Sequence, residues 1–224
     1  MSATRGASDA GAKTELLVTL IVGEGAVERL KAVMAAVPVA SVVLASPDGR
    51  EMAAGDVLPL ISIGQAGGAA MLIRDDARLA RTVKADGVHV SAGDDIAARY
   101  EEARAVAGGR AIVGADAGRT RHDAMALGEA GADYVAFGVP GFVKERETAF
   151  ERQIELIGWW SEIFEIPCVA LDCPTPEQAA HLADAGADFV SLEIPTGMTG
   201  ADAVAVAQSW RDAMAGGGDE TEPE

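Results

Sequence analysis

The feature that most constrains the fold is a nine-residue phrase that occurs twice, at Ala130–Gly138 and Ala185–Glu193. Each copy reads Ala-Gly-Ala-Asp followed by an apolar segment, AGADYVAFG and AGADFVSLE. The glycine is typical of a helix end, and the short polar corner leads directly into a buried strand. Related patterns occur at residues 84–90 and 108–114. A chain that repeats a helix end and a strand in this way is predicted to form a β/α barrel.

Apolar runs separated by helical patterns divide the chain into eight βα units. The expected strands cover residues 16–22, 39–45, 69–73, 86–91, 110–116, 132–139, 167–172 and 188–194. Clear helices are expected at residues 26–37, 94–107, 121–130, 148–164, 176–185 and 199–214. Segment 51–66 contains Gly55, Pro59 and Gly64, so its helix is expected to be short or broken, and segment 75–83 has room for only about two turns. The pattern predicts an α/β fold with a single (β/α)8 TIM barrel.

Length and charge narrow the class of protein. The 224 residues suit one barrel, expected at residues 14–215, between a disordered N-terminal segment, 1–13, and a disordered acidic tail, 216–224. A formal net charge of −17 argues against nucleic acid as a partner. No apolar run is long enough for a membrane span and the N-terminus is polar, so no membrane partner and a cytoplasmic location are expected. Cys168 and Cys173 are expected to be reduced and structural.

Chemistry is expected where the strands end, because catalytic residues of such barrels lie at the C-terminal face. In an otherwise acidic chain, the segments after the predicted strands carry Arg50, Arg74, Arg119, Arg121, Lys144 and Arg146. One interpretation is a ring of cations that holds a phosphate or carboxylate. The alternative is that these side chains solvate the rim of the barrel and pair with Asp48, Asp123 or Glu145. The sequence leaves both interpretations open.

Four motifs resemble, in order and spacing, the thiamine-phosphate synthase and TenI family of barrels. They are Ile73–Ala80, Asp86–Asp94, Ile112–Gly114 and Gly131–Gly138, and the resemblance extends over about residues 60 to 195. It implies a transferase that couples a pyrimidine diphosphate to a thiazole phosphate in thiamine biosynthesis. The partner implied by this resemblance is a small phosphorylated heterocycle.

The resemblance also implies a set of site residues. Asp75 and Asp94 match the two aspartates that hold Mg²⁺ at the ends of strands three and four, and carboxylate oxygens are ligands that Mg²⁺ prefers. Helix capping is the alternative role for both aspartates. Lys144 matches the lysine after strand six and is the candidate catalytic residue. The residues expected to bind the substrate or another anion are Arg74, Arg119, Arg121 and Lys144.

Other positions depart from the family pattern. Residues 42–46 (VVLAS) lack the Gln, Arg and Lys that hold the diphosphate at the end of strand two. Asp172 and Cys173 replace paired glycines whose amides approach a phosphate, and a carboxylate there would repel that phosphate. Asp116 stands where the family has a serine after strand five. The second hypothesis is therefore a non-catalytic paralogue that binds a small phosphorylated or anionic ligand.

Several polar residues have structural interpretations instead. His89 is expected to be a hydrogen-bonded residue inside or beneath the barrel rather than a catalytic one. Asp133 and Asp188, the aspartates of the repeated phrase, are expected to stabilise the starts of their strands at the opposite face. Asp76 and Asp95 adjoin the proposed metal ligands and are expected at helix starts.

Two neighbouring tryptophans bear on oligomeric state. Trp159 and Trp160 point about 100° apart on one predicted helix, so at most one of them faces the barrel squarely. The other would reach the subunit interface of a homo-oligomer or lie partly buried under a loop.

Overall fold

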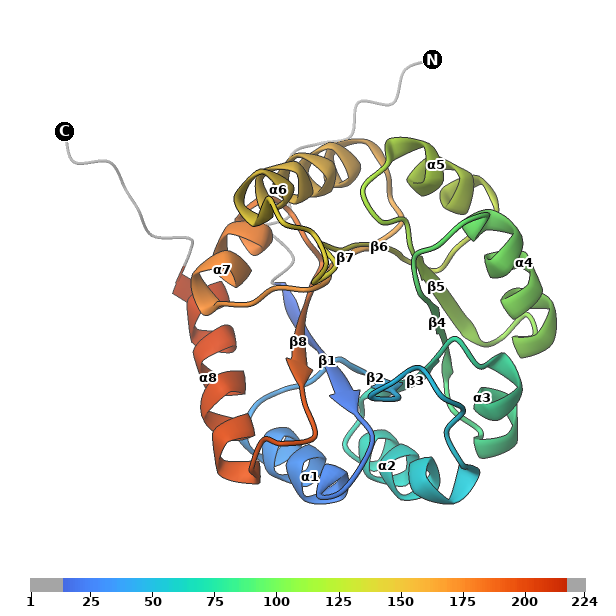
Figure 1. Ribbon diagram of the computed structural model, residues 1–224, viewed down its shortest axis with the longest axis vertical. Helices are drawn as coiled ribbons and strands as arrows, with labels where there is room; N and C mark the ends of the chain where they lie inside the picture. The colour runs from blue at the N-terminus through green and yellow to red at the C-terminus, as the bar shows by residue number, and fades with distance from the viewer. Residues whose placement is uncertain (1–13, 217–224) are drawn as a thin grey trace, which may run out of the picture.

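Eight parallel strands form a closed barrel inside eight helices in the computed structural model, which describes residues 14–216 (Figure 1). The strands are β1 (Glu15–Ile21), β2 (Ser41–Ala45), β3 (Ala70–Arg74), β4 (Gly87–Val90), β5 (Ile112–Asp116), β6 (Val135–Phe137), β7 (Cys168–Ala170) and β8 (Phe189–Ile194). The helices are α1 (Ala26–Ala36), α2 (Ala54–Ala66), α3 (Ala77–Val83), α4 (Ile96–Ala107), α5 (Arg121–Glu129), α6 (Arg146–Ile163), α7 (Pro176–Asp184) and α8 (Gly200–Gly216). The predicted single (β/α)8 barrel is confirmed.

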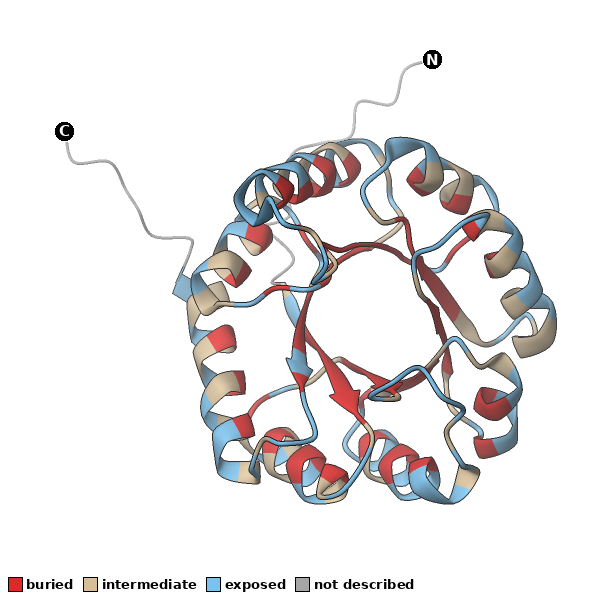
Figure 2. Cartoon of the chain, viewed as in Figure 1, coloured by how far each residue is buried: buried red, intermediate tan, exposed pale blue. Residues whose placement is uncertain are grey.

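Neighbouring strands pair in chain order, and β1 closes the barrel by pairing with β8. The closing register places Leu17 opposite Ser191 and Thr19 opposite Glu193. Figure 2 shows that the strands are buried along most of their length, while the helices expose the faces that point away from the barrel. Because all strands are parallel, the loops that follow them lie at one face, which we call the C-terminal mouth.

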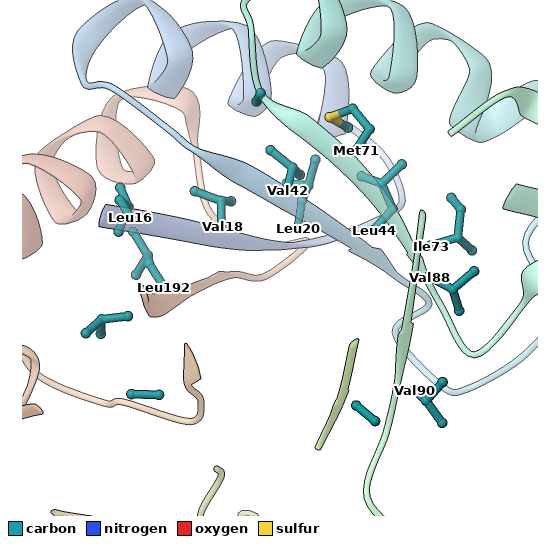
Figure 3. Close-up of a cluster of buried hydrophobic side chains, with 14 of the residues drawn as sticks. Leu16, Val18, Leu20, Val42, Leu44, Met71, Ile73, Val88, Val90 and Leu192 are labelled. Atoms are coloured by element: carbon teal, nitrogen blue, oxygen red, sulfur yellow. The ribbon is translucent and has the colours of Figure 1, made fainter. Parts of the chain in front are cut away.

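Two apolar layers hold the strands and helices together, because side chains alternate between the two faces of a strand. Outward-facing residues such as Val18, Val42 and Ile73 are fully buried between the barrel and its helices (Figure 3). The inward-facing cluster consists of Leu17, Val43, Leu72, Tyr134, Ala136, Val169 and Leu171. Burial of one such aliphatic side chain contributes about 1.5–3 kcal/mol, so both layers stabilise the closed barrel.

The aspartate that follows each helix end makes the same contact in three units. Asp86, Asp133 and Asp188 each accept a hydrogen bond from a backbone N–H of the preceding strand, at 2.8, 2.7 and 2.8 Å. The donors are the amides of Met71, Val113 and Cys168. This contact explains why the phrase recurs, and it supports the structural role expected for Asp133 and Asp188.

A polar pair fills part of the barrel interior. The hydroxyl of Tyr134 and Nδ1 of His89 lie 2.8 Å apart, and both side chains are buried. Tyr134 fits because residue 114 is glycine: a Cβ on Gly114 would lie 2.2 Å from the tyrosine ring. Burial lowers the pKa of His89 to about 3, so the imidazole is neutral near neutral pH. The expectation that His89 is a hydrogen-bonded core residue is confirmed.

Helix α2 differs from the prediction of a short or broken helix. It is continuous for thirteen residues and contains Pro59. A proline inside a helix removes one backbone hydrogen bond and crowds the preceding turn. Val57, Leu60 and Ile61 are buried, and their burial offsets that cost. Helix α3 has seven residues, as short as expected.

The ends of the predicted domain are covered only in part. Residues 1–13 and 217–224 lie outside the described residues, and the disorder predicted for them stays a prediction. Gly216, which the sequence assigned to the acidic tail, is instead the last residue of α8. Among the residues that the structure describes, no helix is long and apolar enough to cross a membrane.

The neighbouring tryptophans of α6 and the two cysteines lie as expected. Trp160 is fully buried and donates a 2.7 Å hydrogen bond to the carbonyl of Ile166, whereas Trp159 is only partly buried. Cys168 and Cys173 are both buried free thiols. Only one of the two tryptophans is thus fully buried, in agreement with their divergent directions.

Candidate functional site

Three charged residues lie at the C-terminal mouth, and we call them the inner cluster. Arg74 is the last residue of β3, Asp116 is the last residue of β5, and Asp172 follows β7. The two carboxylates face the same side of Gly138: a Cβ there would lie 2.6 Å from Oδ2 of Asp172 and 3.3 Å from Oδ2 of Asp116. Glycine at this position leaves the space that the carboxylates need.

Asp116 is the most buried acid of the inner cluster, with 7% of its surface exposed. Its Oδ1 accepts a 2.7 Å hydrogen bond from the N–H of Gly118. Burial raises the pKa of Asp116 to about 7, and the charge of Asp172 adds to the increase, while the Gly118 amide and Arg74 oppose it. The carboxyl group can therefore gain or lose a proton near neutral pH.

The backbone around Asp172 is held firmly. Gln153 of α6, itself buried, donates 2.8 Å hydrogen bonds to the carbonyls of Phe137 and Leu171, which lie at the ends of β6 and β7. Asp172 has a φ of 55°, in the left-handed region. Desolvation raises the pKa of its carboxyl group, and the positive charges of Arg74 and Arg146 oppose that increase.

Arg74 supplies the positive charge of the inner cluster. Within residues 14–216 its guanidinium makes no hydrogen bond or ion pair, and its Nε is buried without an acceptor. A cavity of about 30 Å³ is lined by Arg74, Asp172 and Glu193, and also by Thr19 and Ser191, whose hydroxyls lie 2.9 Å apart. We call it the inner cavity. An unpaired guanidinium in its wall can bind an acceptor atom of a ligand.

A wider pocket of about 500 Å³ lies between the loops after β5 and β6 and the first turns of α6. Its charged lining consists of Arg119, Lys144 and Arg152 together with one carboxylate, that of Glu145, and we call it the outer pocket. Phe142, also in its lining, is 83% exposed. Glu145 at the N-cap of α6 makes no side-chain capping bond. The first amides of α6 and the three cations therefore favour a bound anion.

The structure does not bring the four predicted anion-binding residues into one ring. Arg119 and Lys144 share the outer pocket, whereas Arg74 lines the inner cavity. Arg121 lies over the ring of Trp159, with 4.7 Å between the guanidinium carbon and the ring centroid. This cation–π contact occupies Arg121 on the helical layer.

Arg50 and Arg146, the two remaining basic residues of this face, bind other parts of the protein at the rim of the barrel. Arg50 forms an exposed ion pair with Asp48. Arg146 donates hydrogen bonds of 2.9 and 3.0 Å to the carbonyls of Val139 and Pro140. Arg146 therefore shapes the loop after β6, and Arg50 stays at the surface.

Asp75 and Asp94, the predicted metal ligands, follow β3 and β4. Oδ1 of Asp75 accepts a 2.8 Å hydrogen bond from the N–H of Ser91 and pairs with Arg99 at 3.2 Å. None of the hydrogen bonds between described residues involves Oδ2 of Asp75, and Asp94 is exposed. Over residues 14–216, no group of three or more His, Cys, Asp or Glu could enclose a metal ion. Mg²⁺ often uses one or two carboxylates with waters and substrate, so the donor chemistry of Asp75 and Asp94 suits this ion.

The aspartates next to these ligands lie at helix starts. Asp76 is the N-cap of α3 and accepts a 2.8 Å hydrogen bond from the N–H of Leu79. Asp95 occupies the N-cap position of α4 without a capping hydrogen bond. The expected position is confirmed for both residues, and the capping bond only for Asp76.

Residues 18–193 match the sequence profile of the thiamine monophosphate synthase family. The chain belongs to this family. The thiamine-phosphate synthase of Erythrobacter litoralis is 43% identical over 136 residues, which cover 60% of this chain and 62% of that protein. The thiamine-phosphate synthase of Rhodospirillum centenum is 43% identical over 150 residues, 66% of this chain and 69% of that protein. The match to the Erythrobacter relative thus spans less than two thirds of that relative's length.

One solved structure shares the barrel fold of this chain. The thiamine phosphate pyrophosphorylase from Pyrococcus furiosus superposes with a TM-score of 0.69 and covers 93% of this chain and 98% of its own. Its sequence identity is 19%, so the likeness concerns the barrel fold. The family resemblance predicted from the motifs is confirmed by the profile match.

Some residues of the site had weak signals in the sequence. The sequence marks Asp116 and Asp172 only as departures from the family pattern, although Asp116 ends β5 and Asp172 lies two residues after the end of β7. Arg152 lies four residues after Thr148, a helical spacing that places both along the outer pocket. Arg99 had no signal, because it meets Asp75 across 24 residues of sequence through tertiary packing.

Proposed function

We propose that this protein is a thiamine-phosphate-synthase-type transferase, which couples a pyrimidine diphosphate to a thiazole phosphate and releases diphosphate. Family membership over residues 18–193 supports the reaction class. The observation that carries the proposal is the outer pocket, where three cations gather at the C-terminal mouth of a chain with a net charge of −17. Such a pocket suits a phosphorylated heterocycle. A cytoplasmic location is part of the same proposal.

The outer pocket would hold the diphosphate. Lys144, the candidate catalytic residue, would contact the leaving diphosphate and stabilise the charge that develops as its bond to the pyrimidine breaks. Arg119 and Arg152 would bind the remaining oxygens through their planar guanidinium groups. The exposed ring of Phe142 offers an apolar surface to a heterocycle.

Asp75 and Asp94 would hold Mg²⁺ in this enzyme. A bound Mg²⁺ would neutralise part of the charge of a diphosphate. Ser91 and Arg99 fix Oδ1 of Asp75, so Oδ2 is the oxygen that remains for a metal. Arg99 would therefore orient the carboxylate of Asp75, and its positive charge would compete with Mg²⁺ for that carboxylate.

Turnover by the purified full-length chain tests the proposal. With both substrates and Mg²⁺ we expect thiamine phosphate, measured by mass spectrometry, and an equal amount of released diphosphate. Lys144→Ala should lower kcat/KM, while Arg50→Ala, at the exposed pair with Asp48, serves as the matched control. Absence of both products with the wild-type chain would refute the transferase.

A non-catalytic paralogue that binds a small anion is the second candidate, and a specific observation favours it. Strand β2 carries no basic residue, and Asp172 places a carboxylate at the mouth where a phosphate would meet repulsion. This candidate predicts binding of diphosphate in the outer pocket without turnover. Calorimetry with inorganic pyrophosphate, with and without Mg²⁺, separates it from the transferase when combined with the turnover assay.

A further inference from the structure

A second cavity lies at the opposite end of the barrel, where the strands begin, and we call this end the N-terminal mouth. Its volume is about 310 Å³, within the range of sites that bind small organic molecules. The cavity shares no lining residue with the inner cavity or the outer pocket. Most of its lining is apolar and includes Leu17, Leu72, Ile112, Tyr134, Val169 and Phe189.

The cavity exists because two inward-facing positions carry small side chains. Ser41 pairs with Leu17 across β1 and β2, and Ala70 lies two residues before Leu72 on the same face of β3. Bulky branched residues dominate the interior layers of such barrels, so serine and alanine leave space here. Leu17, Leu72 and Val169 are at most 2% exposed and form the buried wall of that space.

The charged lining of the cavity is entirely acidic. It consists of Glu15 and Asp133, and no Lys, Arg or His lines the cavity. Asp133 is already paired with Arg104. Glu15 has no ion pair or side-chain hydrogen bond with any residue of the described range 14–216. The unpaired charge at this rim is therefore negative, and it favours a cation.

The nearest basic residue of the neighbouring surface does not neutralise Glu15. Arg211 lines an adjacent pocket together with Glu15, but its guanidinium is bound to Asp212, with 3.0 Å between Nε and Oδ1. The carboxylate of Glu15 thus remains available to a ligand.

An aromatic ring lies beside the unpaired carboxylate. Glu15 and Phe189 are register partners across β1 and β8, so their side chains are neighbours on the same face of the sheet. Both residues line the cavity. A cation at this point can pair with the carboxylate and also lie against the face of the ring, which attracts positive charge. An apolar cavity with such a rim suits a ligand that has a ring at one end and a positive charge at the other.

We propose that the N-terminal mouth binds a small aromatic amine as its ammonium ion. The ring occupies the apolar cavity, and the ammonium group donates hydrogen bonds to Glu15 beside Phe189. An aromatic anion would be repelled by Glu15, and an ammonium ion without a ring would bury no apolar surface. This inference goes beyond the proposed function, because the site lies at the other face of the barrel and uses none of the residues assigned to the transferase.

Three probes separate the contributions of ring and charge. They are 2-phenylethylamine, 2-phenylethanol, which lacks the charge, and ethylamine, which lacks the ring. Titration of the full-length chain, followed by ligand-observed NMR or calorimetry, should show about 3- to 30-fold tighter binding of 2-phenylethylamine than of 2-phenylethanol. Ethylamine should bind at least about tenfold more weakly than 2-phenylethylamine.

Each alternative result of these titrations contradicts the proposal. Equal affinities for 2-phenylethylamine and 2-phenylethanol would show that no charge is recognised. Equal affinities for 2-phenylethylamine and ethylamine would show attraction to the acidic surface in general. Absence of 2-phenylethylamine binding up to its solubility limit would overturn the site, whatever else covers the cavity.

Glu15→Gln locates the charge that the ligand recognises. Glu15 is exposed, so the substitution removes a charge without disturbing the core. The preference for 2-phenylethylamine over 2-phenylethanol should fall to about one. Glu101→Gln makes the same change at an exposed position of α4 and should keep the preference. A preference retained in Glu15→Gln would overturn the assignment.

Ala70→Leu fills the cavity and locates the ring. Binding of both aromatic probes should fall at least about tenfold, while the midpoint of thermal unfolding stays the same or rises, because the added side chain fills existing apolar space. Ala98→Leu, at an exposed position of α4, is the matched control and should bind as the wild type does. Undiminished binding to folded Ala70→Leu would place the ligand elsewhere and overturn the proposal.

Discussion

The two halves of the C-terminal mouth hold their charges in different ways. The inner cluster sets one cation among carboxylates at the ends of strands, around a cavity of about 30 Å³. The outer pocket gathers three cations on loops and on α6, around a space of about 500 Å³. The two halves therefore differ both in size and in the balance of their charges, and the outer pocket is the half that we propose for a large anion.

The elements that carry each half explain the contrast. Arg74 and Asp116 end strands that are locked by pairing on both sides, and Gln153 ties the backbone beside Asp172 to β6. Arg119 and Lys144 stand on loops that strand pairing does not fix. A rigid half can select a small group by shape and hydrogen bonding, and a looser half can accommodate a large, highly charged one.

The largest expected effect comes from removing cations of the outer pocket. The double variant Arg119→Ala/Lys144→Ala should lower kcat/KM by roughly 10²- to 10⁴-fold, because each hydrogen bond to a charged group is worth about 1.5–3 kcal/mol. Its free energy of unfolding should stay within about 0.5 kcal/mol of the wild type, because both side chains are exposed. Steady-state kinetics and urea unfolding measure the two quantities. An unchanged kcat/KM in the double variant would show that the outer pocket does not hold the diphosphate.

The next effect is a pH dependence of stability that belongs to the inner cluster. The pKa of Asp116 is raised by burial to about 7 in the folded protein, against an ordinary value of 3.8, so the folded state retains a proton that the unfolded state releases. This stabilising contribution is complete below about pH 4 and is lost as pH rises through about 7. As pH rises, the wild type should lose roughly 2–4 kcal/mol more unfolding free energy than the Asp116→Asn variant, which has no carboxyl group to titrate.

Urea unfolding at pH 5 and pH 8 measures this contribution as the difference between wild type and variant. Arg74 and Asp172 also face this carboxyl group, and both residues are present in the wild type and in the variant. Asp56→Asn, at an exposed carboxylate on α2, is the control for general charge repulsion. An Asp116→Asn difference that does not change with pH would contradict the assigned pKa.

A smaller effect should follow from filling the space between the two carboxylates. Gly138→Ala would place a methyl group 2.6 Å from Oδ2 of Asp172, so the side chains must move. We expect a loss of about 1–3 kcal/mol in unfolding free energy. Gly141→Ala is the control, because its Cβ would meet nothing within 4 Å. Equal stability of the two variants would show that the carboxylates are not held as described.

The smallest effect is expected at the rim, outside both halves. Arg50→Ala breaks an exposed ion pair with Asp48, although that pair lowers the pKa of Asp48 to about 2. Water screens such a pair, so the midpoint of urea unfolding and kcat/KM should be unchanged within error. A clear loss of activity would mean that the loop after β2 reaches the substrate.

Much of the fold could be predicted because its signals are local. The repeated Ala-Gly-Ala-Asp phrase combines a helix end, a corner and a strand within nine residues, and the order of eight such units leaves a closed barrel as the simplest arrangement. Helix α2 was mispredicted because the signal of Pro59 is local too, whereas the burial of Val57, Leu60 and Ile61 that outweighs it is not.

The sequence predicts which face of the barrel carries the site, but not how the residues are arranged within it. The sequence correctly predicts that Arg74, Asp116, Arg119 and Lys144 lie at or after the ends of strands, but it does not predict the division of the mouth into two halves. Arg121, grouped with them by sequence, packs on Trp159 38 residues away in the chain. Where a long side chain comes to rest depends on neighbours that only the packed helices supply.

By itself, the sequence determined the barrel, the family and the face that carries the chemistry, because periodicity, helix ends and motif spacing act over a few residues. Tertiary structure decided which charges meet. The folded barrel brings Asp116 and Asp172 to the same glycine, leaves Nε of Arg74 without an acceptor among residues 14–216, and places Arg74 and Lys144 in the linings of different pockets. These contacts depend on strand direction and side-chain packing between distant segments, which no short stretch of sequence encodes.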